Sequence, residues 1–250
     1  MREGFYLMVS NLGGASLLLF STLRCLHQFP RSFRLTMEQM RVTGIQSLPI
    51  VILISVFIGM VAAYFAHLQA RDFVPVVYVG LGVAKSVMVE LGPLLTGLVL
   101  VGRVGASMAA ELGTMRVTEQ IDALETMAIN PVRYLVLPRF LAGIVMLPVL
   151  VILAEFFAII AGMILGATSL GIPMHTFAVG LRLQYVPREL YVGIIKAVFF
   201  GGIITLMGCY HGFNAEGGAE GVGRAATRAV VSGSVLVLIF DYIIARAVLG

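Results

Sequence analysis

The sequence predicts an all-α membrane protein: an amphipathic interfacial helix near the N-terminus, five transmembrane helices, and a charged helix between the second and third of them. The chain is 59% hydrophobic and 12% charged, against about 25% charged residues in a typical soluble domain. Its mean hydropathy is +0.99. Several apolar runs approach the roughly 20 residues that cross a bilayer. At 250 residues, a single bundle is favoured over two domains.

Residues 1–44 are predicted to lie at the membrane surface, and residues 45–250 to form the membrane domain. The first apolar stretch, residues 5–29, is a poor spanning candidate because polar residues and glycines interrupt it. In the "RSFRLTMEQMRVTG" that follows, apolar side chains recur on one helical face and charged side chains lie on the others. A basic amphipathic helix of this kind lies in the interface rather than across it.

The five transmembrane helices are predicted from apolar runs between charged or glycine-rich segments. They are Ile45–His67, Ser86–Leu112, Phe140–Thr168, Leu190–Tyr210 and Ala229–Leu249. With the N-terminus inside, ten basic residues fall on inner segments and five on outer ones. Because cytoplasmic loops are enriched in basic residues, the N-terminus is expected in the cytoplasm and the C-terminus outside.

The outer loop between spans three and four contains "MHTFAVGLRLQYVPREL". Apolar and aromatic side chains recur there every four residues, at Phe177, Leu181 and Tyr185. This spacing is compatible with a short helix on the outer surface and with an ordinary loop packed on the bundle.

The segment between spans two and three, "GTMRVTEQIDALETMAINPVRYLVLPR", is typical of a surface helix in a soluble protein. Thr118 is its predicted N-cap and Asn130-Pro131 its predicted end, so the helix covers about residues 118–129. One face collects Ile121, Leu124 and Ala128. We expect a short amphipathic helix that faces the cytoplasm.

Two roles are open for this central helix. It can rest on the bilayer, or a soluble partner can hold it and pass movement through it to spans two and three. Acidic groups weaken the first role, since anionic leaflets attract basic helices. These groups are Glu111, Glu119, Asp122 and Glu125.

Two long segments resemble the MlaE family, the permeases of lipid ABC transporters that work with MCE-domain proteins. They are "ELGPLLTGLVLVGRVGASMAAELGTMRVTEQIDALETMAINPVRYLVLPR" and "GGAEGVGRAATRAVV". The resemblance runs from about residue 45 to the C-terminus. It implies a homodimeric, non-enzymatic permease of the inner membrane, with a periplasmic C-terminus, that moves phospholipid or a similar lipid.

The resemblance also implies partners. These are a second copy of the chain, a separate ABC ATPase and an MCE-domain protein on the outer side, with a small STAS-like regulatory subunit as an option; no nucleic acid is expected. The ATPase would bind the central helix through a set of mostly charged residues: Arg116, Glu119, Gln120, Asp122, Leu124 and Glu125.

No cofactor, metal or catalytic residue is expected in this chain. A Walker A loop needs Gly-Lys-Ser/Thr to cradle phosphates. The two lysines stand in "AKS" (Lys85) and "IKA" (Lys196), and Cys25 and Cys209 have no metal-binding spacing. ATP would therefore be used by the partner subunit.

Four ionisable side chains are predicted in the outer half of the membrane: Glu90, Glu155, Lys196 and Asp241. Such groups are costly in hydrocarbon and usually face a cavity or a partner. Lys196 is a candidate for binding a phosphate headgroup, with Asp241 or Glu90 pairing with it when the cavity is empty. The alternative is a structural Lys196–Asp241 ion pair. Glu155 is assigned no role.

In the family, the carboxylate of the "ELGP" segment contributes to the lipid-binding region, which by resemblance is Glu90 here. Some members carry an arginine where this chain has Val89. Apolar cavity walls are expected from span one and the outer loop, with Phe73 and Tyr78 as candidates.

Span two carries small residues every four positions, which lets helices approach closely within the chain or across a dimer. The candidates for this packing are Gly102, Gly105, Ala109 and Gly113. A polar stripe on the same span serves either packing and anchoring or the relay of movement from the central helix. It consists of Arg103, Ser107 and Glu111.

The glycine-rich "GFNAEGGAEGVGRAATRAVV" is predicted to be a cytoplasmic turn that begins span five. It is not a phosphate-binding loop, because no strand precedes it. Arg224 and Arg228 would anchor it at the interface, and the turn could also touch the ATPase.

Two other classes of function stay open. An ion-coupled secondary transporter would use the outer-half carboxylates as proton sites and would depend on an ion gradient without an ATPase. A non-transporting membrane scaffold would retain no lipid after purification.

Overall fold

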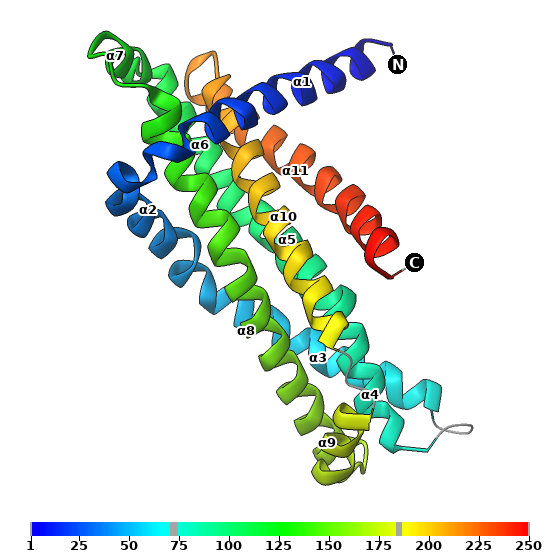
Figure 1. Cartoon of the computed structure of the whole chain (residues 1–250). Helices are drawn as coiled ribbons and strands as arrows, with labels where there is room; N and C mark the ends of the chain where they lie inside the picture. Colours follow the sequence, from blue (N-terminus) through cyan, green and yellow to red (C-terminus); the bar gives the residue numbers. More distant parts are fainter. Residues whose placement is uncertain (1, 71–74, 184–186, 250) are drawn as a thin grey trace.

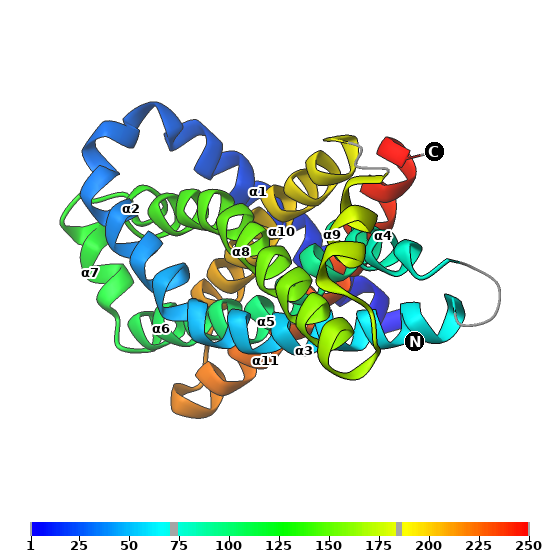
Figure 2. The same cartoon turned by 90° about the horizontal axis from the view of Figure 1, so that it is seen from below.

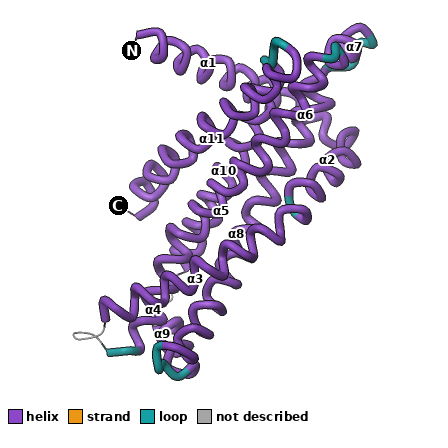
Figure 3. Tube along the Cα trace, turned by 180° about the vertical axis from the view of Figure 1, so that it is seen from behind, coloured by secondary structure: helices purple, strands orange, loops and turns teal. Residues whose placement is uncertain are grey.

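The computed structural model describes residues 2–70, 75–183 and 187–249. Within these ranges the chain consists of helices and short turns, which confirms the predicted all-α class (Figures 1 and 3). The α-helices are α1 Arg2–Arg24, α2 Phe29–Thr43, α3 Leu48–Ala70, α4 Val77–Ser86, α5 Gly92–Leu100, α6 Ala106–Val117, α7 Gln120–Thr126, α8 Leu137–Ser169, α9 Met174–Leu183, α10 Pro187–Phe213 and α11 Gly218–Leu249.

Shorter helical turns join several of these elements. Two are 3₁₀ turns, η1 Cys25–Gln28 and η2 Ile45–Ser47. Three are π-helical, η3 Val87–Leu91, η4 Val101–Gly105 and η5 Val132–Val136. The π turns continue the helices on either side of them, so α4 to α6 form one long segment and η5 leads directly into α8.

Five helical segments among the described residues are long and apolar enough to cross a membrane, as predicted. They are Ser32–Ala70, Val77–Val117, Val132–Ser169, Arg188–Phe213 and Gly218–Val248. Most extend beyond the predicted limits. Hydropathy finds only the part in hydrocarbon, whereas helical hydrogen bonds continue into the polar residues beyond it.

Helix α10 lies at the centre of the bundle and packs against α8, α11, α6 and α5 (Figure 2). Its Phe200 and Ile204 are fully buried in a core that includes Leu100 of α5, Leu147 of α8 and Val237 of α11. The central position of α10 explains why residues on it connect several spans.

Glycines set the closest helix crossings. A Cβ on Gly59 of α3 would lie 1.8 Å from the carbonyl oxygen of Ala158 in α8, and one on Gly201 of α10 would lie 2.3 Å from that of Gly143 in α8. Only glycine fits such backbone contacts, which are typical of helices packed in a membrane.

The small residues of span two pack largely within the chain. A Cβ on Gly208 of α10 would lie 2.9 Å from the Gly105 oxygen. Similarly, Gly113 faces Ala215 of the α10–α11 turn, and Ala109 is fully buried. A Cβ on Gly102 would meet no atom of the described residues within 4 Å, so this member of the set faces open space. The predicted contact of this set across a dimer stays a prediction.

The N-terminal region forms two helices. The predicted amphipathic helix is α2, which packs against α8. Its Ser32 and Thr36 are buried, whereas Phe33 and Met37 are 52% and 45% exposed. Its apolar face is thus free for the bilayer. Helix α1 packs its second half on α10, while its first half leaves the bundle (Figure 1).

The bundle has two distinct ends (Figure 1). One carries α7 and the turn between α10 and α11, and we call it the α7 end. The other carries α9 and the connection from α3 to α4, and we call it the α9 end. Helix α9 confirms the short-helix option for the loop between the third and fourth spans, with Phe177 fully buried and Gly180 packed on Val77 of α4. Tyr185 lies outside the described residues.

The turn between α10 and α11 requires glycine. Gly217 and Gly218 have φ of +87° and +67°, a region that side-chain-bearing residues avoid. A Cβ on Gly221 would lie 1.7 Å from the Glu216 carbonyl oxygen. This explains the glycine-rich sequence as a tight turn that starts span five.

Candidate functional site

The structure brings three of the predicted membrane charges together. Lys196 is fully buried, and its Nζ lies 2.7 Å from Glu90 Oε2 and 2.8 Å from Asp241 Oδ1. The same Nζ donates a hydrogen bond to the Val89 carbonyl oxygen at 3.1 Å. The Glu90 carboxylate and the Val89 carbonyl thus accept hydrogen bonds from the ammonium group, whereas Asp241 Oδ1 is held as a counter-ion and has no hydrogen-bond partner among the described residues. One cluster joins η3, α10 and α11.

The Val89 acceptor is a consequence of Pro93. In a regular helix the N–H of residue 93 would bond the carbonyl of residue 89, but proline has no N–H. The helix instead widens into the π turn η3, where the Gly92 N–H bonds the Val87 oxygen. The freed Val89 carbonyl accepts from Lys196. A π turn of this kind is frequent at functional sites.

A groove lies between α3 and the α4–η3 segment, and one of its lining residues, Leu91, follows Glu90 of the cluster directly in the sequence. Its volume is about 550 Å³, within the range of small-molecule sites. Most of its lining is apolar: Val61, Ala62, Phe65, Ala66, Gln69, Ala70, Tyr78, Gly82, Ser86 and Leu91. Alanines four residues apart on α3 leave the space that larger side chains would fill.

The predicted cavity residues are distributed unevenly around the groove. Tyr78 lines it, and Glu90 directly precedes the lining residue Leu91. Phe73 lies outside the described residues. Glu155 is buried at 4% exposure beside Gly92 and Gly193, and it forms no ion pair within the described ranges.

At the α7 end, the short helix α7 turns its apolar side inward. Ile121 is 3% exposed and packs with Leu112, Leu135 and Val136, while Leu124 is half-buried against the same cluster. The side chains of Glu119, Gln120 and Glu125 are exposed. Ile121 and Leu124 are therefore covered by the chain's own bundle, whereas the acidic side chains are left outside together with Met127, which is 68% exposed.

Three details of the central helix were predicted wrongly. The helix covers Gln120–Thr126 and ends before Asn130-Pro131, rather than covering residues 118–129. Thr118 does not cap α7, because its hydroxyl donates back to the Thr114 oxygen at 2.8 Å and ends α6 instead. Glu119, with φ of 60°, stands at the N-cap position. Ala128, with φ of 57°, lies beyond the helix and is exposed, so it is not on the buried face.

The junctions on both sides of α7 are held by polar contacts. Arg116 in α6 forms an ion pair with Asp122 in α7. Asn130 Oδ1 accepts hydrogen bonds from the N–H groups of Val132 and Arg133, at 2.9 and 3.3 Å. Asn130 thus caps the helix that follows it. These contacts fix α7 between spans two and three.

The polar stripe of span two is anchored to neighbouring elements. Arg103 donates to the Ser47 hydroxyl, and Glu111 Oε1 lies 2.7 Å from Arg139 Nη2 of α8. The three stripe residues, Arg103, Ser107 and Glu111, line a small cavity of about 120 Å³ next to α2. These contacts agree with a packing and anchoring role for the stripe.

Comparison with known proteins identifies the family of the chain. A model of the family "Permease MlaE" matches residues 36–247. The chain belongs to the MlaE permease family. The "Intermembrane phospholipid transport system permease protein MlaE" of Haemophilus influenzae is 37% identical over 96% of this chain and 92% of its own length. A "Probable ABC transporter permease protein" of Rickettsia bellii is 37% identical over 95% and 92%. The Arabidopsis thaliana "Protein TRIGALACTOSYLDIACYLGLYCEROL 1, chloroplastic" is 33% identical over 85% and 61%.

An apolar cavity wall was expected from span one, and α3 does line the groove, although the alanines that form the wall, Ala62, Ala66 and Ala70, were not named. Two other features of this MlaE-family permease were not predicted. The Val89 carbonyl was missed, although Pro93 within an apolar run signals a freed acceptor. Gly59 was also missed, because a single glycine in a helix carries no periodic signal.

Proposed function

We propose that this chain is the membrane permease of an ABC transporter that moves phospholipid or a similar lipid, with ATP hydrolysed by a separate subunit. In this proposal two copies of the chain form the membrane part in the inner membrane. The α7 end faces the cytoplasm and the ATPase, and the α9 end faces an MCE-domain partner; a small regulatory subunit is optional. The Haemophilus and Rickettsia relatives carry names that agree with this role.

The observation that carries the proposal is the apolar groove between α3 and α4. It is large enough for acyl chains, with about 550 Å³ and an apolar majority in its lining. Glu90 adjoins it in sequence and belongs to the only cluster of three charged side chains that the described residues form inside the predicted membrane. Apolar walls next to a few polar groups are typical of lipid sites.

The geometry of α7 supports docking of the ATPase rather than rest on the bilayer. An interfacial helix inserts its apolar face into lipid. Here that face is occupied by Leu112, Leu135 and Val136 of the same chain. The exposed acidic side is suited to a protein partner, and the ion pair between Arg116 and Asp122 would carry movement into α6.

The rival proposal, an ion-coupled transporter, is less well supported. Its proton sites would be the outer-half carboxylates, but Glu90 and Asp241 form ion pairs with Lys196, which leaves Glu155 as the one of the three without an ion pair among the described residues. Transport that depends on an ion gradient and persists without an ATPase would favour the rival.

The groove is tested by filling it. Replacing Ala66 by Trp places a large ring between α3 and α4. The control is Val145→Trp on α8, whose side chain is 46% exposed and does not line the groove. Lipid retained by the gently purified complex is measured by native mass spectrometry.

We expect Ala66→Trp to lose most of the retained phospholipid and of the ATP-driven transport, while Val145→Trp behaves as the unmodified permease. Equal lipid retention and transport in both variants, with normal assembly, would remove the groove from the mechanism.

A further inference from the structure

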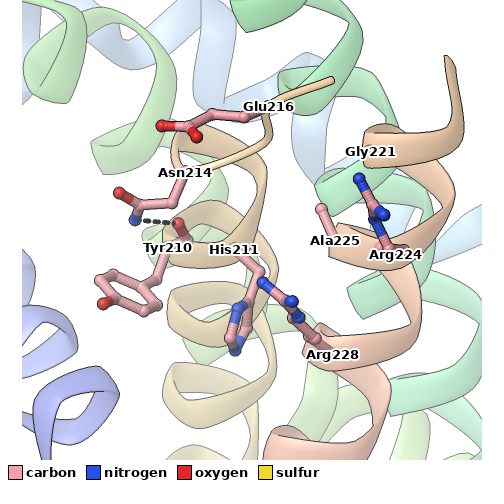
Figure 4. Close-up of a pocket in the computed structure, with 8 residues that line it drawn as sticks. All are labelled: Tyr210, His211, Asn214, Glu216, Gly221, Arg224, Ala225 and Arg228. Atoms are coloured by element: carbon pink, nitrogen blue, oxygen red, sulfur yellow. Dashed lines mark hydrogen bonds between the residues drawn. The ribbon is translucent and has the colours of Figure 1, made fainter. Parts of the chain in front are cut away.

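A second polar cavity lies at the α7 end, far along the bundle from the groove in α3 and α4. The last turns of α10 and the first turns of α11 enclose about 220 Å³, far above the roughly 10–15 Å³ that one water needs (Figure 4). Two arginines of α11, Arg224 and Arg228, and His211 and Asn214 of α10 line it. None of these residues takes part in the groove or in α7.

The two arginines differ in their partners. Arg224 Nη1 lies 3.1 Å from Glu220 Oε1, an exposed pair at the rim. Arg228 forms neither an ion pair nor a side-chain hydrogen bond within the described part of the chain, and Figure 4 shows its guanidinium directed at the ring of His211. Glu216 also lines the cavity, but Figure 4 shows its carboxylate pointing away from both arginines. Arg228 is exposed, so its guanidinium is open to a ligand that enters the cavity.

His211 cannot turn away from this charge. It is 5% exposed, and its Nε2 lies 2.9 Å from the Ser232 hydroxyl. That hydroxyl donates its one hydrogen to the Arg228 carbonyl at 2.7 Å, so it accepts from Nε2–H. The guanidinium of Arg228 thus lies beside a fixed imidazole at the wall of the cavity. A planar guanidinium is suited to a phosphate in particular, because it can bind two of its oxygens at once.

The surface below the cavity favours a lipid as the source of that phosphate. Helix α10 ends at Phe213 and α11 begins at Gly218, so the cavity lies at one end of two helices that are long and apolar enough to cross a membrane. From Arg228, an apolar stripe runs along α11 into the membrane at helical spacing. Its members are exposed: Val231 59%, Val235 37%, Leu238 50% and Tyr242 70%. A headgroup at Arg228 would have this stripe for its acyl chains.

We infer that this cavity binds the phosphate group of a phospholipid from the leaflet at the α7 end, with Arg228 as the main cationic contact and the α11 stripe against the acyl chains. The site is separate from the groove and from its proposed role in transport. It would hold a lipid between α10 and α11 even if the groove proved to bind none.

The test uses the full chain in mixed micelles, titrated with phosphatidylglycerol and, separately, with diacylglycerol, which lacks the phosphate. Bound lipid is counted by native mass spectrometry. The variants are Arg228→Gln, which removes the charge, and Arg228→Lys, which keeps it. The control is Arg246→Gln, the same change on an exposed residue near the other end of α11. Inorganic phosphate at constant ionic strength, followed by thermal stability, tests free phosphate as the ligand.

We expect Arg228→Gln to weaken phosphatidylglycerol binding about tenfold, equivalent to ~1.4 kcal/mol. Arg228→Lys should lose less, Arg246→Gln nothing, and diacylglycerol binding should not respond to any change. Unchanged phosphatidylglycerol binding in Arg228→Gln would overturn the inference. Stabilisation by inorganic phosphate without any retained lipid would also overturn it, because it would assign Arg228 to free phosphate. Loss of ATPase co-purification in Arg228→Gln with intact lipid binding would overturn it too, because it would assign Arg228 to a carboxylate of a partner protein.

Discussion

Replacement of Lys196 by Met tests whether the Glu90–Lys196–Asp241 cluster holds three spans together. The ammonium group is fully buried, and removing it leaves Glu90 and the Val89 carbonyl without their hydrogen-bond donor and Asp241 without its counter-ion. Breaking a buried ion pair by removing one partner costs about 3–5 kcal/mol. For a chain of this size each kcal/mol lowers Tm by about 2–4 °C, so we expect a loss of about 6–20 °C.

The assay is thermal unfolding of the purified permease in nanodiscs. The control removes all three charges in Lys196→Met/Glu90→Gln/Asp241→Asn, which leaves no unpaired charge and should recover most of the lost stability. A single variant as stable as the unmodified chain would refute the structural role of the cluster. A triple variant as unstable as the single one would show that ion pairing is not the reason for the loss.

Two further predictions concern the helix crossing and α7. Gly59→Leu should block the approach of α3 to α8 and lower the yield of folded protein in size-exclusion chromatography, since even a Cβ would lie 1.8 Å from the Ala158 oxygen. The control Gly102→Leu meets open space and should leave that yield unchanged. Equal yields of the two would show that the crossing is not as close as described. Glu125→Lys on the exposed side of α7 should reduce co-purification of the ATPase, whereas Glu38→Lys, an exposed acid on α2, should not. Full retention of the ATPase by Glu125→Lys would count against docking at α7. Leu124 is a poor site for this test, because it packs against the chain's own core.

The fold was predicted well where a residue's role is decided by hydropathy. Five apolar runs of bilayer length allow no soluble alternative, and each corresponds to a helix in the structure. Helix ends were predicted less well, because polar side chains such as Thr118 can end one helix or cap the next. Choosing between these depends on the path of the chain, which local sequence does not determine.

The candidate site was predicted in part. A charge in the membrane needs a partner, so Lys196, Asp241 and Glu90 were expected near one another, and they are. An apolar wall from span one and Tyr78 were expected, but the position of the groove between α3 and α4 could not be derived in this way. It exists because small residues on α3 face α4 at a distance set by the glycine contacts of α3 with α8 and of α4 with α9. Such spaces depend on the packing of several helices, which one helix's periodicity does not reveal.

The central claim is that α7 is the contact with a soluble ATPase, at the end of the bundle opposite to α9. Site-specific photo-crosslinking tests it most directly, with the crosslinker at exposed Gln120 in α7 or at exposed His175 in α9. We predict that Gln120 crosslinks to the ATPase in the assembled complex and that His175 does not. Crosslinks from Gln120 to lipid alone, or ATPase crosslinks from His175, would contradict the account.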